Sequence, residues 1–196
     1  MIAALTYDPW ESGILDPTVH KSLVAKSDTY ARDAGIPAPF IWSKSFDFLP
    51  RKDEQDWLNS YPKNRSKGHV GMVYLGGGFD PTIEVRMSAI AGKLVRNFIR
   101  GRVMTMEGVL QGMQTGDPPE ATCLLLPTFT EARPNEKRAS MVADLLLSRW
   151  KDGRSQTVLY SASLEAIGNV YGGFVRYHVA AHYVEIVGTP VKKVSR

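Results

Sequence analysis

The sequence contains a single cysteine, Cys123, and the lack of a second thiol excludes an intrachain disulfide and a cysteine-based zinc site. Cys123 lies in an apolar run, which predicts an inert, buried thiol. The other metal-binding side chains are sparse: His20, His69, His178 and His182 form no dense cluster, although the last two are spaced to share one helix face. We therefore expect no metal site.

Long apolar runs are also missing. No stretch approaches the ~18 residues that a membrane-spanning helix needs, and the N-terminus lacks a basic region followed by an apolar one. These absences predict a soluble, cytoplasmic protein. With 196 residues, 43% of them hydrophobic, the chain is long enough for one domain with a sizeable core. The formal charge of +4 is compatible with a nucleic-acid or acidic partner and equally with an ordinary solvated surface.

The rest of the chain is organised around an apolar run, residues 70–75, that enters the glycine turn Gly76-Gly77-Gly78 and is followed by a helical pattern. This is the layout of a phosphate-binding loop between a buried strand and a helix. Such a loop needs a lysine that reaches the β- and γ-phosphates and a hydroxyl that holds Mg²⁺. Counting from Gly76, Thr82 occupies the lysine position. The sequence predicts the architecture of a nucleotide site without its chemistry.

Apolar runs alternate with helical patterns from residue 70 to residue 187, which predicts an α/β fold with a parallel sheet flanked by helices. Strands are expected at 70–75, 101–106, 121–126, 157–160 and 183–187, and helices at 17–34, 50–61, 83–98, 107–113, 136–150, 163–171 and 174–181. Ligands of such sheets bind beyond the carboxyl ends of the strands. Chemistry is therefore expected in the loops 76–82, 127–135 and 161–164.

The helical pattern at 83–98 has one apolar stripe, which ends at Phe98, and an opposite basic face. This face and a basic segment before the first strand are the best nucleic-acid candidates, and the alternative is an ordinary solvated surface. The candidate DNA-binding residues are Arg86, Lys93, Arg96, Arg100, Arg102, Lys63, Arg65 and Lys67. The aromatic residues are interpreted as core rather than base-stacking platforms, and these are Trp42, Phe46, Trp57 and Trp150.

Several further pieces occur in a fixed order: Ala34-Gly35-Ile36-Pro37, the helix with Trp57, the strand into the glycine loop, the apolar strand 123–126, Arg149-Trp150, and the segment 157–165. This order resembles the bacterial helicase-loader and transposase-helper ATPases, which are AAA+ proteins of the DnaC/IstB type. The resemblance spans residues 31–187. It places 123–126 as the Walker B strand and 157–161 as the sensor-1 strand.

The catalytic signature that this resemblance implies is missing. Walker B should end in two acids, but the strand runs into Pro127 and Thr128, and the first acid is Glu131. The sensor-1 asparagine position is Ala162. Arg176 lies near the family's arginine finger, which acts in trans on a neighbour's nucleotide, and His178 aligns with that position equally well. Without these groups the charge that develops on the γ-phosphate is not stabilised, so we expect no ATP hydrolysis.

The resemblance implies an N-terminal arm and short helix at 1–34, an AAA+-like α/β domain without a helical lid at 35–188, and a basic tail at 189–196. The expected function is that of a catalytically inactive, helicase-loader-like binding subunit in DNA replication or a mobile-element complex. Its partners would be a helicase, a transposase or an AAA+ neighbour, with DNA as a further candidate and ATP or ADP bound weakly if at all. Two alternatives stay open: a divergent ATP-hydrolysing enzyme, and a structural or inhibitory module without DNA binding.

Overall fold

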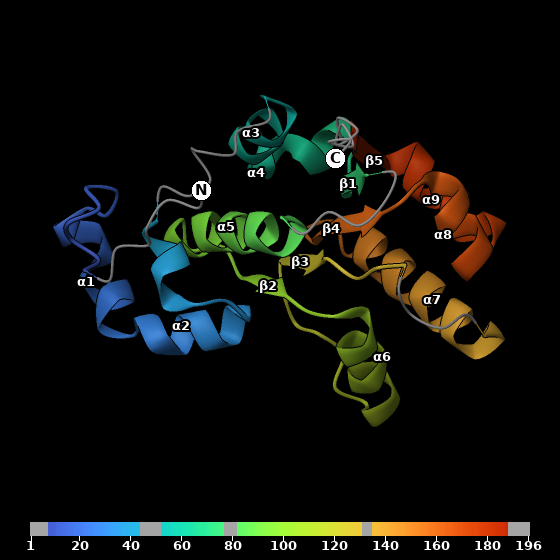
Figure 1. Cartoon of the computed structure of the whole chain (residues 1–196), viewed down its shortest axis with the longest axis horizontal. Helices are drawn as coiled ribbons and strands as arrows, with labels where there is room; N and C mark the ends of the chain where they lie inside the picture. Colours follow the sequence, from blue (N-terminus) through green and yellow to red (C-terminus); the bar gives the residue numbers. More distant parts are fainter. Residues whose placement is uncertain (1–7, 44–51, 77–81, 131–134, 188–196) are drawn as a thin grey trace, which may run out of the picture.

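The computed structural model describes residues 8–43, 52–76, 82–130 and 135–187. Within them, five parallel strands form one sheet in the order β2-β3-β4-β1-β5. The strands are β1 (Gly71–Leu75), β2 (Gly101–Val103), β3 (Cys123–Leu126), β4 (Gln156–Ser161) and β5 (Tyr183–Val187). The predicted fold class, a parallel sheet flanked by helices, is confirmed (Figure 1).

Helices cover both faces of the sheet. One face is covered by α1 (Pro17–Ala25), α2 (Ser27–Ala34), the 3₁₀ turn η1 (Ala38–Ile41), α3 (Lys52–Asn59) and α5 (Ile83–Arg96). The other face is covered by α6 (Met106–Thr115), α7 (Glu136–Asp152), α8 (Leu164–Tyr171) and α9 (Gly173–His182). The short turns α4 (Tyr61–Asn64) and η3 (Arg65–Lys67) lead into β1. In Figure 1 the outer end of α6 projects away from the body of the domain.

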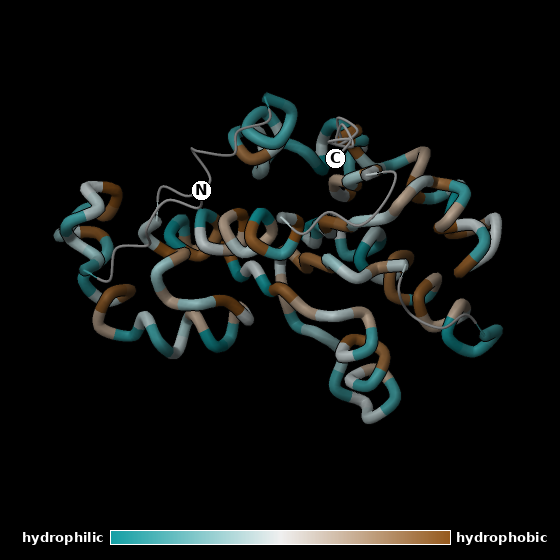
Figure 2. Tube along the Cα trace, in the orientation of Figure 1, coloured by the Kyte–Doolittle hydropathy of each residue, from teal (hydrophilic) through white to brown (hydrophobic). Residues whose placement is uncertain are grey.

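The strands are apolar at consecutive positions because alternate side chains enter two separate cores. Met72 and Tyr74 of β1 pack with α5, whereas Val73 between them packs with α7–α9. Leu124 and Leu126 of β3 join the second core, and both are fully buried. This is the pattern of a sheet covered on both sides. Figure 2 shows that hydrophobic and hydrophilic residues both occur along α5, as expected for a helix with one face on the core.

Capping residues set several of the helix boundaries. Thr105 accepts a hydrogen bond from the Gly108 N–H (3.2 Å) at the start of α6, and Asn135 accepts one from the Arg138 N–H (2.8 Å) at the start of α7. The sequence predicted a strand that extends to residue 106. Because Thr105 is the N-cap of α6, β2 instead ends at Val103. No helix of the described ranges is long and apolar enough to cross a bilayer.

Close packing of α5 on η1 depends on one glycine. A Cβ atom at Gly92 would lie 2.1 Å from the carbonyl oxygen of Phe40, a distance at which the backbone would have to move. Phe40 and Ile41 of η1 are buried in the same core as α5. Residues 44–48, including the predicted core residue Phe46, lie outside the described residues.

The single helix predicted at 17–34 is instead two helices. Lys26 leaves the helical conformation (φ −120°, ψ 22°), and its N–H bonds the carbonyls of Leu23 and Val24. The break allows Leu23 of α1 and Ala31 of α2 both to reach the core. Helix α5 and its apolar stripe are confirmed, except that Phe98 is 64% exposed, with φ 59°.

Cys123 is buried at the start of β3, as predicted, and burial raises the pKa of its thiol to about 12. The thiolate is the reactive species, so it is almost absent near neutral pH. We expect iodoacetamide at about pH 8 to label the native protein far more slowly than the protein in denaturant, since the unfolded thiol has a pKa of about 8.5. Mass spectrometry of labelled protein measures both rates. Equal rates would contradict a buried, protonated thiol.

Candidate functional site

The glycine loop begins at the carboxyl end of β1, between β4 and β5. The Gly76 N–H donates to the Ser161 carbonyl of β4 (3.1 Å), and a Cβ at Gly76 would lie 2.9 Å from the Tyr160 ring. Gly77 and Gly78 lie outside the described residues. Thr82 is the N-cap residue of α5, and its carbonyl accepts the Arg86 N–H (2.9 Å). The strand and the helix thus flank the loop as the sequence predicted.

The segment that follows β3 is held by packing and hydrogen bonds. Thr128 Oγ1 accepts the N–H of Met106 (3.0 Å). Phe129 is fully buried, its ring centroid lies 4.9 Å from that of Tyr171, and the Tyr171 hydroxyl donates to the Phe129 carbonyl. Pro127, Thr128 and Phe129 bring no carboxylate to this position, and Glu131 lies outside the described residues. The metal ligand that Walker B supplies in this layout has no counterpart at 127–129.

The segment that follows β4 serves to start α8. The Ser161 hydroxyl donates to the Ser163 carbonyl (2.9 Å), and the Ser163 hydroxyl accepts the Ala166 N–H (3.1 Å). Ala162 between them is exposed. A methyl group neither donates nor accepts a hydrogen bond, so position 162 cannot contact a phosphate or a water as an asparagine would.

Arg176 lies on the surface of α9. Its Nη2 atom is 3.4 Å from Oε1 of Glu165 on α8, with the two side chains 51% and 67% exposed. The pKa of Glu165 is lowered, first by its own backbone N–H and the Ser163 hydroxyl and then by Arg176. An exposed ion pair of this kind holds its partners weakly. The arginine therefore stays accessible to a neighbouring molecule.

Arg86 does not belong to an exposed basic face, and that prediction is wrong. The side chain is buried, and its Nη1 atom lies 2.7 Å from each carboxylate oxygen of Glu54 on α3, which is itself fully buried. The pair joins α3 to the first turn of α5. Sequence spacing did not reveal it because the two residues are 32 positions apart on different helices.

The remaining basic residues of α5 are also engaged with the protein. Lys93 and Arg96 are half-buried, and the Arg96 Nη1 atom lies 3.4 Å and 3.3 Å from the carbonyl oxygens of Ile41 and Ser43. Arg100, beyond the helix, is exposed and lies 3.7 Å from Glu120. The basic stripe seen in the sequence is therefore not a continuous surface for a polyanion.

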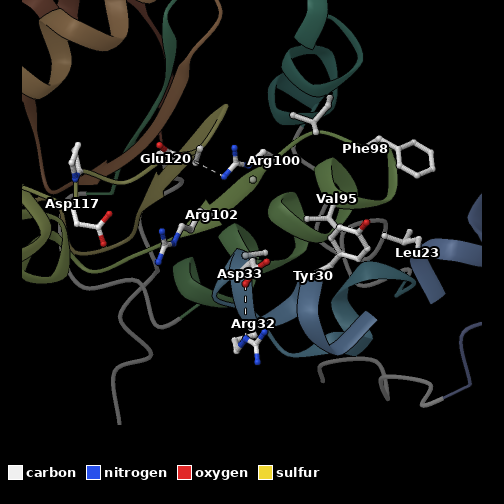
Figure 3. Close-up of a pocket in the computed structure, with 15 residues that line it drawn as sticks. Leu23, Tyr30, Arg32, Asp33, Val95, Phe98, Arg100, Arg102, Asp117 and Glu120 are labelled. Atoms are coloured by element: carbon white, nitrogen blue, oxygen red, sulfur yellow. Dashed lines mark ion pairs between the residues drawn. The ribbon is translucent and has the colours of Figure 1, made fainter. Parts of the chain in front are cut away.

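A cavity of about 710 Å³ opens between α2, the end of α5 and the segment before β3 (Figure 3). Its charged lining consists of Arg32, Arg100, Arg102, Asp33, Asp117 and Glu120. Arginines and acids are equal in number, and Arg32 pairs with Asp33 (3.9 Å) as Arg100 does with Glu120. The balance of charge makes this cavity a poor site for a polyanion, although Arg100 and Arg102 were candidates for one.

The other basic segment lies at the amino edge of the sheet, where the strands begin. Arg65 donates from Nε to the Gly153 carbonyl (3.2 Å) and from Nη2 to the Trp150 carbonyl, so it ties η3 to the end of α7. Lys63 and Lys67 are exposed. The expected basic loop is thus two short helical turns, held against a helix that is distant in sequence.

Trp150 and two histidines form a cluster at this edge. The His182 ring stacks on Trp150 (5.5 Å, 25°), and His178 lies edge-on to it (6.0 Å). The two histidines share a face of α9, as predicted, with ring centroids 5.0 Å apart. No group of three metal-binding side chains occurs in the part of the chain that the structure describes. Trp150 was expected in the core and is 42% exposed, whereas Trp42 and Trp57 are buried as predicted.

Comparison with known proteins bears on the fold. No protein-family model and no curated protein sequence matches the chain. Among solved structures it is similar to AMPPCP-bound DnaA from Aquifex aeolicus (13% identity, TM-score 0.52, 68% of this chain and 45% of that one). It is also similar to the replication initiator DnaA bound to AMPPCP and single-stranded DNA (12% identity, TM-score 0.53, 69% of this chain and 44% of that one). A third match is domain III of the Thermotoga maritima replication initiation protein DnaA (13% identity, TM-score 0.55, 96% of this chain and 70% of that one).

The chain has the AAA+ P-loop fold. It spans less than half the length of the first two DnaA structures, and at 12–13% identity the similarity is one of fold alone. Within the described residues, β5 is the last element of the AAA+ core, and no helical lid is part of it. The carboxyl edge of this fold holds the glycine loop, and the Trp150 cluster lies at the opposite, amino edge.

Burial of His178 predicts a pH-dependent stability. Its Nε2 atom has no hydrogen-bond partner among the described residues. Burial first, and then His182 and Arg65, lower the pKa of His178 to about 4. An unfolded histidine has a pKa of about 6.5, so the unfolded chain binds the proton first. The contribution of neutral His178 is complete above pH ~6.5 and is lost as the pH falls from ~6.5 toward 4.

We expect the free energy of unfolding to fall by about 1–2 kcal/mol between pH 7 and pH 5 through this residue. Urea unfolding at the two pH values measures the change. In His178→Gln the dependence should be reduced by that amount. If the variant and the parent lose the same stability, His178 is not the responsible group.

Proposed function

We propose that this protein is a catalytically inactive AAA+-fold subunit that binds partners in a DNA-replication or mobile-element assembly. The observation that carries the proposal is the carboxyl edge of the sheet, where Phe129 and Ala162 follow the two strands that normally bring acid and asparagine to a nucleotide. The similarity to DnaA structures in fold supports a replication context.

The chemical reason to expect inactivity is that the charge of the transferred phosphoryl group must be stabilised during ATP hydrolysis. An AAA+ site stabilises it with a loop lysine and with Mg²⁺ held by hydroxyl and carboxylate groups. From Gly76 to Val85 the sequence has no lysine or arginine, and the next basic residue, Arg86, is bound to Glu54. The loop amides and the N-terminus of α5 would support weak ATP or ADP binding at most.

Binding to partners would use surfaces away from this edge. A helicase, a transposase or a neighbouring AAA+ subunit is the expected protein partner, as in the DnaC/IstB-type proteins that the sequence resembles. Exposed Arg176 would reach such a neighbour's nucleotide in trans. One of the matched DnaA structures is bound to single-stranded DNA, and this supports DNA as a second partner.

The test of inactivity is an ATPase assay with and without Mg²⁺ on the purified protein. We expect no turnover above the level of a heat-denatured sample. Magnesium-dependent turnover that disappears in Gly77→Val or Thr82→Ala would overturn the proposal and favour a divergent enzyme. Thr115→Ala serves as the matched control, because Thr115 is exposed at the end of α6.

The role of Arg176 is tested on a complex purified from the native host. If the complex hydrolyses ATP, Arg176→Ala is expected to lower its turnover by at least about tenfold, as for other trans-acting arginines. Arg32→Ala, at another exposed arginine, should leave turnover unchanged. Equal turnover in the Arg176 variant and the parent would remove the trans role.

A further inference from the structure

We propose that the amino edge of the sheet carries a binding site for single-stranded nucleic acid, with Trp150 as its stacking platform. This inference deepens the DNA-binding part of the proposed function and rests on it, but it does not depend on the loss of ATP hydrolysis. The site is separate from the glycine loop and from the cavity beside α2.

The first argument is the exposure and support of the Trp150 ring. The residue is 42% exposed, although it is a large aromatic at the end of an amphipathic helix. His182 stacks on it and His178 meets it edge-on, so the indole is held from the protein side by two rings. Arg65 donates a hydrogen bond to the backbone carbonyl oxygen of Trp150. A supported aromatic ring with an exposed part is what a nucleic-acid base stacks on.

The second argument is the charge around the ring. The contacts of Arg65 bring the segment 63–67 beside the turn 150–154, and these two segments carry four exposed cations: Lys63, Lys67, Lys151 and Arg154. None of the four has an ion-pair partner among the described residues. The one acid within the two segments, Asp152, accepts hydrogen bonds from the Ser155 hydroxyl (2.6 Å) and N–H (3.0 Å).

Together, these features favour a single strand over other polyanions. Free ammonium and guanidinium groups attract a phosphate backbone, and an adjacent aromatic ring adds stacking that every base can use. A duplex keeps its bases stacked internally and cannot use the ring. The cavity beside α2 offers aromatic side chains too, but its arginines are balanced by acids. At the amino edge, by contrast, exposed cations without ion-pair partners among the described residues lie beside an exposed aromatic ring.

The experiment is fluorescence anisotropy of the full-length protein with a labelled oligothymidine of about 15 nucleotides, a length that spans one typical single-strand site. Binding is measured at several salt concentrations. Trp150→Ala should weaken binding by about tenfold, the loss of one stacked base, while Trp150→Phe should retain most of the affinity. Lys151→Glu and Arg154→Glu should each weaken binding and reduce the slope of log affinity against log salt by about one.

Lys137→Glu is the matched control. Lys137 is exposed on the first turn of the same helix, about 21 Å from Lys151 at 1.5 Å per residue, and the change alters net charge equally. Far-ultraviolet circular dichroism checks that all variants are folded. A loss as large in Lys137→Glu as in Lys151→Glu would overturn the site, as would unchanged binding by Trp150→Ala. Equal competition by polyglutamate would assign the surface to an acidic protein instead.

These outcomes are separate from those of the ATPase assay. A protein that binds the oligonucleotide through Trp150 and also hydrolyses ATP would retain this inference and lose the proposed inactivity. A protein that does neither would lose this inference while remaining a candidate assembly subunit that contacts only proteins.

Discussion

Replacing Arg86 with methionine is expected to lower the free energy of unfolding by about 3–5 kcal/mol, because the change removes a cation that contacts a fully buried carboxylate, that of Glu54. Glu54 is fully buried, and Arg86 contacts both of its carboxylate oxygens at 2.7 Å. A domain has about 5–15 kcal/mol of stability in total, so the loss would leave the protein marginal. Urea unfolding monitored by circular dichroism measures it.

The exposed pair Arg100–Glu120 provides the matched control. The same chemical change, Arg100→Met, should alter stability by less than about 1 kcal/mol, because that pair is solvated. The double variant Glu54→Leu/Arg86→Met removes both charges and should recover part of the loss. Equal effects of Arg86→Met and Arg100→Met would show that the buried pair is not the cause.

The second large effect is expected at Arg149, where substitution by methionine should cost about 3 kcal/mol. This buried guanidinium donates to the carbonyl oxygens of Ala121 (3.0 Å) and Gln156 (2.7 Å) and to the Thr157 hydroxyl (3.0 Å). These acceptors lie where β3 and β4 begin. Burial lowers the pKa of Arg149, yet the planar donor set keeps the charge satisfied. Methionine would leave the acceptors buried without donors.

Lysine at this position should rescue little, since one ammonium group cannot reach the three acceptors in their fixed directions. Arg154→Met, at an exposed arginine just beyond α7, should change the unfolding free energy by less than about 0.5 kcal/mol. Thermal and urea unfolding of the three variants separates these cases. Wild-type stability in Arg149→Met would contradict the role of the guanidinium at the start of the strands.

The elements of the fold could be predicted from the sequence because the strands are buried on both faces and the helices are amphipathic. Those patterns are local, and β5 at Tyr183–Val187 was predicted to the residue. Helix ends were harder. Phe98 and Trp150 continue an apolar pattern in the sequence, but Phe98 lies two residues beyond the end of α5 and Trp150 lies in the last turn of α7, and both side chains are exposed.

The basic residues were the least predictable, since their partners are distant in sequence. Arg86 looks like a solvent-facing cation until α3 places Glu54 beside it. Arg65 looks like part of a loop until it meets the end of α7, 85 residues away. That 127–129 hold no acid and position 162 no asparagine can be read from the sequence itself, because those positions follow recognisable strands. Long-range pairing requires the tertiary structure.

The packing of Phe129 against Tyr171 has a consequence for signalling within the molecule. A nucleotide switch works only if its two ligand states make different contacts with a movable element, and the difference in those contacts is the coupling free energy. Here the segment after β3 is fixed to α8 by a buried ring and by the Tyr171 hydroxyl, and its side chains at 127–129 carry no charge with which to sense a phosphate. We therefore expect this packed segment to transmit no nucleotide-dependent change to α8.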